Sequence, residues 1–152
     1  KTAYEISCSL VGSEMCICDR AYLSRYIRSN NIDGAFRLLQ DFLGTVPYCN
    51  VKNHEGHYQQ MLYVIFTLLT QYRIDVEVHT PHGRIDMVLM TQTHVYIIEI
   101  KLNRNAQTAL QQINLKNYRE RFALSRLPIT KIGVNFDSEK GNITDWTFEQ
   151  DH

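Results

Sequence analysis

Three charged residues lie in two short, otherwise apolar segments near the middle of the chain. Asp86 precedes the apolar residues 87–90, and Glu99 and Lys101 flank Ile100 at the end of a second apolar run. Because side chains alternate between the two faces of a strand, Glu99 and Lys101 should share one face and Ile100 the other. If residues 91–93 close a hairpin, Asp86 lies beside Glu99. The pattern predicts two carboxylates and a lysine close together at the end of a core strand.

Such a cluster is suited to metal-assisted hydrolysis. Two close carboxylates repel each other, and a divalent ion between Asp86 and Glu99 would remove that cost. Carboxylate oxygens suit Mg²⁺, which keeps several waters and accepts phosphate oxygens at its other positions. Lys101 would orient or deprotonate the attacking water. The cluster therefore favours a bound cation or a reaction that uses one. The alternative is an ion-pair cluster that stabilises the edge of a sheet.

The spacing of these residues resembles that of the PD-(D/E)xK nuclease superfamily. Asp86 stands for the Asp of its Pro-Asp pair, which Arg84-Ile85-Asp86 replaces here, and Glu99-Ile100-Lys101 stands for the Glu-x-Lys. The flanking segments 83–86, 96–101 and 109–113, together with Tyr118, are similar to the subfamily found at the C-terminal side of bacterial AAA-ATPase-like proteins. The resemblance covers roughly residues 31–150.

The resemblance implies an α/β fold with a restriction-endonuclease-like core, in which a central mixed β-sheet is flanked by helices. It implies a nuclease domain that depends on Mg²⁺, or on Mn²⁺, and that cleaves DNA as part of a larger bacterial protein with an ATPase-like region upstream. The catalytic residues would be Asp86, Glu99, Lys101, Gln112 and Glu55. The metal ligands would be Asp86, Glu99, Glu55 and the carbonyl of Ile100, and the substrate backbone would be held by Arg84, Lys116, Arg119 and Arg121. The alternative is a catalytically inactive module of the same fold that binds nucleic acid or protein.

Glu55 lies in the first turn of the clearest helical pattern of the chain, residues 54–72. Its spacing from Tyr58 and Leu62 places it at the edge of the apolar face. In the family, a helical glutamate at this place helps to hold the metal or its water shell. An acid at a helix start is also commonly a partner of the helix dipole, worth about 0.3 to 1 kcal/mol. Both interpretations of Glu55 stay open.

The order of the elements predicts a mixed sheet. Residues 73–78, 85–90 and 94–100 read as three strands of a meander, followed by a helix over 105–124 and by strands over 129–136 and 143–148. The helix after Lys101 is a crossover that permits a parallel neighbour. Upstream, we expect a hairpin within residues 4–18, a helix capped by Asp19 and a second helix after Asp33. We expect residues 1–30 to be the end of a preceding region and residues 31–152 to form the nuclease-like domain.

The charge of the chain is balanced overall and uneven locally. Sixteen basic and sixteen acidic residues give a net charge of zero. Residues 101–131 contain seven Lys or Arg and one acid, whereas the last twenty-one residues contain five acids and one lysine. The basic segment directly follows the candidate site, so it either contacts phosphates or forms a solvated helix face.

The composition also indicates the cellular environment of the chain and argues against zinc sites and membrane spans. The four cysteines are too few and too irregular for a disulfide framework, and we expect a reduced, cytoplasmic environment. The spacings of Cys16 and Cys18, and of His54 and His57, do not match zinc sites. No apolar run approaches the roughly 18 to 20 residues of a membrane span, so we expect no membrane partner. The chain begins with Lys1, and we expect it to be a piece of a longer protein.

Overall fold

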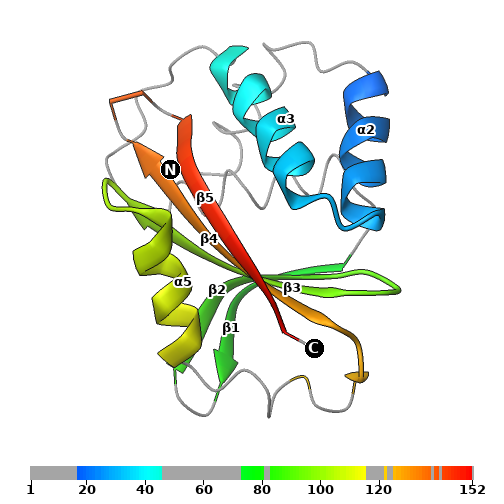
Figure 1. Cartoon of the computed structure of the whole chain (residues 1–152), viewed down its shortest axis with the longest axis vertical. Helices are drawn as coiled ribbons and strands as arrows, with labels where there is room; N and C mark the ends of the chain where they lie inside the picture. The colour runs from blue at the N-terminus through cyan, green and yellow to red at the C-terminus, as the bar shows by residue number, and fades with distance from the viewer. Residues whose placement is uncertain are drawn as a thin grey trace.

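A computed structural model describes residues 17–45, 73–80, 83–115, 122, 125–137, 139–140 and 142–151, with the backbone alone for residues 17–19, 45, 73–80, 83–86, 115 and 151. The elements are two helices, three strands, a crossover helix and two further strands (Figure 1). Their bounds are α2 (Ile17–Arg28), α3 (Ile32–Thr45), β1 (Arg73–Thr80), β2 (Gly83–Met90), β3 (Val95–Leu102), α5 (Ala106–Leu115), β4 (Ile129–Asp137) and β5 (Asn142–Asp151).

The five strands form one mixed sheet in the order β1-β2-β3-β4-β5. β1, β2 and β3 pair antiparallel as a meander, β3 pairs parallel with β4, and β4 pairs antiparallel with β5. The predicted strands, the meander and the parallel neighbour reached through a crossover helix are therefore confirmed.

The predicted hairpin between the two charged segments is also confirmed. The Thr91 amide donates to the His94 carbonyl at 2.9 Å, and the Thr91 hydroxyl oxygen accepts the amides of Thr93 and His94 at 3.2 and 2.9 Å. These bonds close a tight turn that joins β2 to β3. The turn sets the register in which Met90 lies opposite Val95.

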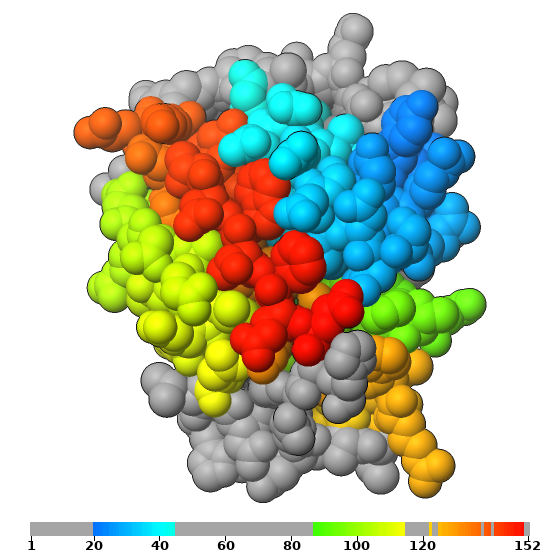
Figure 2. All heavy atoms as spheres, viewed as in Figure 1, coloured from blue at the N-terminus to red at the C-terminus, as the bar shows by residue number. Residues whose placement is uncertain are grey.

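Each face of the sheet is covered by helix. Alternate residues of β3, namely Tyr96, Ile98 and Ile100, pack in a core with α2 and α3. The intervening residues Val95 and Ile97 pack on the other face with Ile113 of α5. Figure 1 shows α5 on one side of the twisted sheet and the α2–α3 pair on the other, and Figure 2 shows β5 at the surface between them. β3 is therefore buried on both faces, as its apolar sequence requires.

The two helices before the sheet start at other residues than predicted. α2 begins at Ile17, so Asp19 lies inside its first turn. The N-cap of α3 is Asn31, whose Oδ1 accepts the Gly34 amide at 3.0 Å. Asp33 lies inside the helix and accepts the indole N–H of Trp146 at 3.0 Å. Asn31 can cap because Asn30 ends α2 in the left-handed conformation, with φ of 59°.

Several predictions lie outside the described residues. These are residues 4–16 of the predicted hairpin, the helix over 54–72 and the continuation of α5 over 116–121 and 123–124. The last two residues of the predicted hairpin, Ile17 and Cys18, lie in α2, so the strand predicted to end at Cys18 is wrong there. Leu23 and Ile27 of α2 pack in the same core as α3, while the division of the chain at residue 30 stays a prediction. Within the described residues, no helix combines the length and apolar character needed to cross a bilayer.

Candidate functional site

Glu99 is a buried carboxylate in the middle of the molecule. Its side chain belongs to the face of β3 that α5 covers, and the residue is 1% exposed. Lys101 follows on the same face and is half-buried, whereas Ile100 packs into the opposite core. The expected alternation of Glu99, Ile100 and Lys101 is thus what β3 shows.

Asp86 and Glu99 come at the same end of the β2–β3 ladder. The pairs of this ladder run from Met90 with Val95 to Met87 with Ile98. Asp86 and Glu99 are the next residues of their strands, and Asp86 shares the face of Val88, which packs in the core under α5. The backbone therefore brings the two positions next to each other on one face. For Asp86 only the backbone is described, so the distance between the Asp86 and Glu99 carboxylates stays a prediction.

A glycine on the neighbouring strand lets α5 approach Glu99. Gly133 of β4 lies opposite Glu99 in the parallel pair. A Cβ atom at this position would collide with the Ala106 carbonyl oxygen and would lie 2.6 Å from the Leu110 amide nitrogen. Both are backbone atoms of α5, which cannot yield as a flexible side chain does. The helix backbone therefore rests directly on the strand beside the candidate site.

Hydrogen bonds hold the first turn of α5. The Asn105 Oδ1 accepts the Thr108 amide at 2.7 Å, which makes Asn105 the N-cap. The Asp145 Oδ2 on β5 accepts the Ala106 amide at 3.0 Å. Two of the amides that a helix start leaves without a helical partner are thus satisfied.

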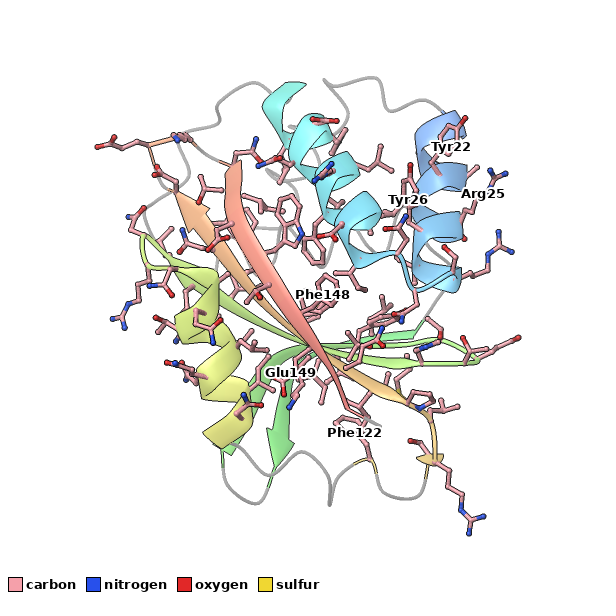
Figure 3. The ribbon with its side chains drawn as sticks, viewed as in Figure 1. Tyr22, Arg25, Tyr26, Phe122, Phe148 and Glu149 are labelled. Atoms are coloured by element: carbon pink, nitrogen blue, oxygen red, sulfur yellow. The ribbon has the colours of Figure 1, made fainter. Side chains whose placement is uncertain are left out.

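The last turn of α5 is held by a buried lysine. Lys131 of β4 is 6% exposed, and its Nζ donates to Asn114 Oδ1 at 2.7 Å. The same Nζ lies 3.4 Å from the carboxylate of Glu149 on β5. Lys131 thus joins α5 to two strands. Figure 3 labels Glu149 on β5.

Gln112 lies on the edge of α5 that faces away from these bonds. Ala109 and Ile113 are fully buried against the sheet, and Gln112 is half-buried. With about 100° of rotation per residue, Gln112 and Asn114 fall on opposite sides of that buried stripe. Because the Asn114 edge is turned toward Lys131 and β5, the Gln112 edge is turned toward β3. The role of Gln112 in steadying Glu99 and Lys101 stays a prediction.

The remaining predicted site residues are only partly placed. Glu55, Lys116, Arg119 and Arg121 lie outside the described residues, and for Arg84 only the backbone is described. Their roles stay predictions.

The ligand set for a metal ion is likewise incomplete in the described chain. Among the residues whose side chains are described, no three His, Cys, Asp or Glu gather as a metal site. Asp86 and Glu55, two of the four expected ligands, are not among the residues whose side chains are described. The two described donors, a buried carboxylate at Glu99 and a backbone carbonyl at Ile100, are hard oxygen ligands and fit a cation such as Mg²⁺.

Sequence reasoning misses two residues of this region. It assigns Lys131 to a basic segment facing solvent or substrate, and the structure corrects this by burying the residue between Asn114 and Glu149. The place of Lys131 between apolar strand neighbours is the signal that could have found it. Gly133 goes unnoticed in the sequence, although a glycine inside an apolar strand often marks a close backbone approach.

Comparison with known proteins gives two matches. A model described as the PD-(D/E)XK nuclease superfamily matches residues 53–146, more than half of the chain. The chain is also 30% identical over 128 residues to an "uncharacterized protein in vnfD 5'region" from Azotobacter chroococcum mcd 1. That second match covers 80% of this chain and 25% of the relative. The chain therefore spans about a quarter of the relative's length.

Proposed function

Because the chain belongs to the PD-(D/E)XK nuclease superfamily, we propose that it is a Mg²⁺-dependent nuclease domain that hydrolyses phosphodiester bonds of DNA. Members of this superfamily are nucleases that generally use divalent metal ions. The observation that carries the proposal is Glu99, a carboxylate buried in a core strand, with Lys101 after it on the same face. Burying a carboxylate this deeply is costly, and a nearby cation offsets the cost.

Four groups would hold the cation. Asp86 and Glu99 would provide two carboxylates, the Ile100 carbonyl a third oxygen, and Glu55 a contact to the ion or its water shell. When bound, Mg²⁺ supplies charge for the phosphate oxygens and lowers the pKa of a coordinated water. Mn²⁺ has the same oxygen preference and is expected to replace it.

The other residues would act on water and substrate. Lys101 lies two residues after Glu99 on the same strand face, which suits a group that orients or deprotonates the attacking water. Gln112 would steady the site from the α5 edge turned toward β3. Arg84, Lys116, Arg119 and Arg121 would contact the phosphate backbone of the substrate, which positions nucleic acid without reading its sequence.

The length of the relative supports a nuclease domain within a longer protein. The chain corresponds to a quarter of the Azotobacter protein, so a nuclease domain within a longer bacterial protein accounts for the match. We propose that this longer protein is cytoplasmic and carries an ATPase-like region upstream.

A cleavage assay tests the nuclease directly. The chain is incubated with single- and double-stranded DNA and RNA in Mg²⁺, in Mn²⁺ and in EDTA. We expect DNA cleavage with either metal and none in EDTA. Lys101→Ala should lower the cleavage rate on the order of a hundred- to a thousand-fold. Lys140→Ala, which removes an exposed lysine from the β4–β5 turn, should cleave like the parent. A parent that cleaves none of the four substrates would instead identify an inactive module of this fold.

A further inference from the structure

The exposed side of α2 combines aromatic and basic side chains. Tyr22 is 48% exposed, although most large apolar residues of the described chain are buried. Arg25 and Arg28, three and six residues after Tyr22 on the helix, are also exposed, and residues 20–28 contain no acid. Figure 3 labels Tyr22, Arg25 and Tyr26 on this helix, and Figure 2 shows α2 at the molecular surface.

These side chains form an ordered stack. Tyr26 packs against Gly34 of α3, where a Cβ atom would lie 2.8 Å from its ring carbons. The ring of Tyr22 stacks on Tyr26 with 6.4 Å between centroids and 26° between planes. The guanidinium carbon of Arg25 lies 5.7 Å from the centroid of the Tyr22 ring. The stack starts at a helix contact and ends at an exposed ring and a planar cation.

The charge and the stacking select one class of partner. A ring and a guanidinium plane both stack on nucleobases, and a neighbouring arginine attracts a phosphate. Bases are available for stacking in single strands, whereas duplex bases are stacked on each other. Acidic peptides would satisfy the arginines but would not use the exposed ring. The combination therefore fits a single-stranded nucleic acid.

We propose that the surface formed by Tyr22, Arg25 and Arg28 binds single-stranded nucleic acid, with a base stacked at Tyr22 and Arg25 and a phosphate on Arg28. α2 packs on the opposite side of the sheet from α5 and the Glu99 face. The surface is thus separate from the candidate cleavage site and would hold a strand outside it. The inference rests on the nucleic-acid substrate class of the proposed function and not on turnover.

Binding in EDTA tests this surface without cleavage. Fluorescence anisotropy of a labelled oligothymidylate measures the affinity of the 152-residue chain at low salt. Tyr22→Ala should bind roughly tenfold more weakly, since stacking on one aromatic ring is commonly worth that much or more. Tyr22→Phe keeps the ring and should bind like the parent. Phe148→Ala is the matched control, because Phe148 is an exposed ring on β5, 37% exposed; it should leave affinity unchanged.

A second variant in the same assay measures the contribution of charge separately from that of stacking. Arg28→Gln should weaken binding several-fold and lower the dependence of affinity on salt, because one phosphate contact is lost. Thermal melts of each variant check folding, and Tyr22→Phe supplies a variant in which the stack on Tyr26 is kept.

Three results would overturn the proposal: a parent that does not bind the oligothymidylate, a Tyr22→Ala variant that binds like the parent, or a Tyr22→Phe variant as weak as Tyr22→Ala. The cleavage assay is judged separately. DNA cleavage with no role for Tyr22 refutes this surface and leaves the nuclease standing. Binding through Tyr22 without cleavage supports the surface and refutes the nuclease.

Discussion

Gly133 on β4 lies opposite Glu99 on β3, and the backbone of α5 occupies the space that a side chain at Gly133 would need. The helix that carries Gln112 is thereby held at close range over the strand that carries the buried carboxylate. The close approach of the helix to the strand beside Glu99 thus requires a residue without a side chain at position 133.

Replacing Gly133 with alanine should both destabilise the fold and impair the site. The added Cβ meets backbone atoms of α5, so the helix must shift. Overpacking of this kind costs about 1 to 3 kcal/mol of unfolding free energy. Urea denaturation measures the cost, and the DNA cleavage rate should fall with it.

Gly44→Ala is the control for this change. The nearest atom to a Cβ added at Gly44 would be Asn142 Nδ2 at 3.7 Å, which is ordinary contact. Since Gly44 lies in the last turn of α3, alanine there should be neutral or slightly stabilising. Equal stability of the two variants would contradict the close approach at Gly133.

Lys131→Ala should destabilise the protein by about 1 to 3 kcal/mol. It removes a buried donor and leaves Asn114 and Glu149 without this partner. Glu149→Gln should change stability by less than about 1 kcal/mol, because the Glu149 side chain is 52% exposed and exposed ion pairs contribute little. Chemical denaturation of both variants checks the difference. A loss as large for Glu149→Gln would mean that the ion pair, and not the bond to Asn114, holds the end of α5.

Tyr96→Phe should cost about 1 kcal/mol. The Tyr96 hydroxyl on β3 donates to the Ile27 carbonyl at 2.9 Å and lies 3.1 Å from the Asn30 Oδ1, so it joins the sheet to the end of α2. Tyr22→Phe, at an exposed ring, should leave unfolding within about 0.5 kcal/mol of the parent. Guanidinium denaturation compares the two tyrosines, and an unchanged midpoint for Tyr96→Phe would show that the hydroxyl adds nothing.

Asp86→Ala and Lys101→Ala should separate metal binding from hydrolysis. Asp86→Ala removes a proposed ligand and should abolish both. Lys101→Ala removes no ligand, so calorimetric titration should still detect Mg²⁺, while the cleavage rate falls on the order of a hundred- to a thousand-fold. Thermal melts provide the folding control. A Lys101→Ala variant as fast as the parent, or a parent that binds no divalent ion, would remove the enzyme from consideration.

Replacing Arg119 and Arg121 together with alanine should weaken duplex DNA binding to a similar degree for every sequence. Phosphate contacts carry no sequence information, and each one lost reduces the salt dependence of affinity. Titrations at several salt concentrations measure both quantities. Unchanged binding would assign these charges to an ordinary solvated helix face.

The sheet was predictable because its signals are local. The apolar run from Val95 to Ile98 marks a strand buried on both faces, and a helical pattern between Lys101 and Ile129 permits a crossover to a parallel neighbour. Alternation along the strand is enough to place the Glu99 and Ile100 side chains on opposite faces of the sheet. These features need only the neighbours in sequence.

The missed features depend on residues that are distant in sequence. Lys131 is buried because Asn114 and Glu149 reach it from α5 and β5. Asn31, and not Asp33, caps α3, because the left-handed backbone of Asn30 ends α2 and places Asn31 at the start of α3. The Asp33 carboxylate instead accepts the indole N–H of Trp146 on β5. Both outcomes require the packed sheet, which no single segment specifies.

The parallel pairing of β3 with β4 has a consequence for how the protein folds. β1, β2 and β3 are joined by short turns, so the positions of Asp86 and Glu99 can meet early. Gly133 reaches Glu99 only after the whole crossover has closed a much longer loop, which costs more chain entropy and slows the step. We therefore expect Glu99 to leave water late in folding, when β4 and α5 dock together. A nascent chain that has emerged only as far as β3 would still hold this carboxylate in solvent.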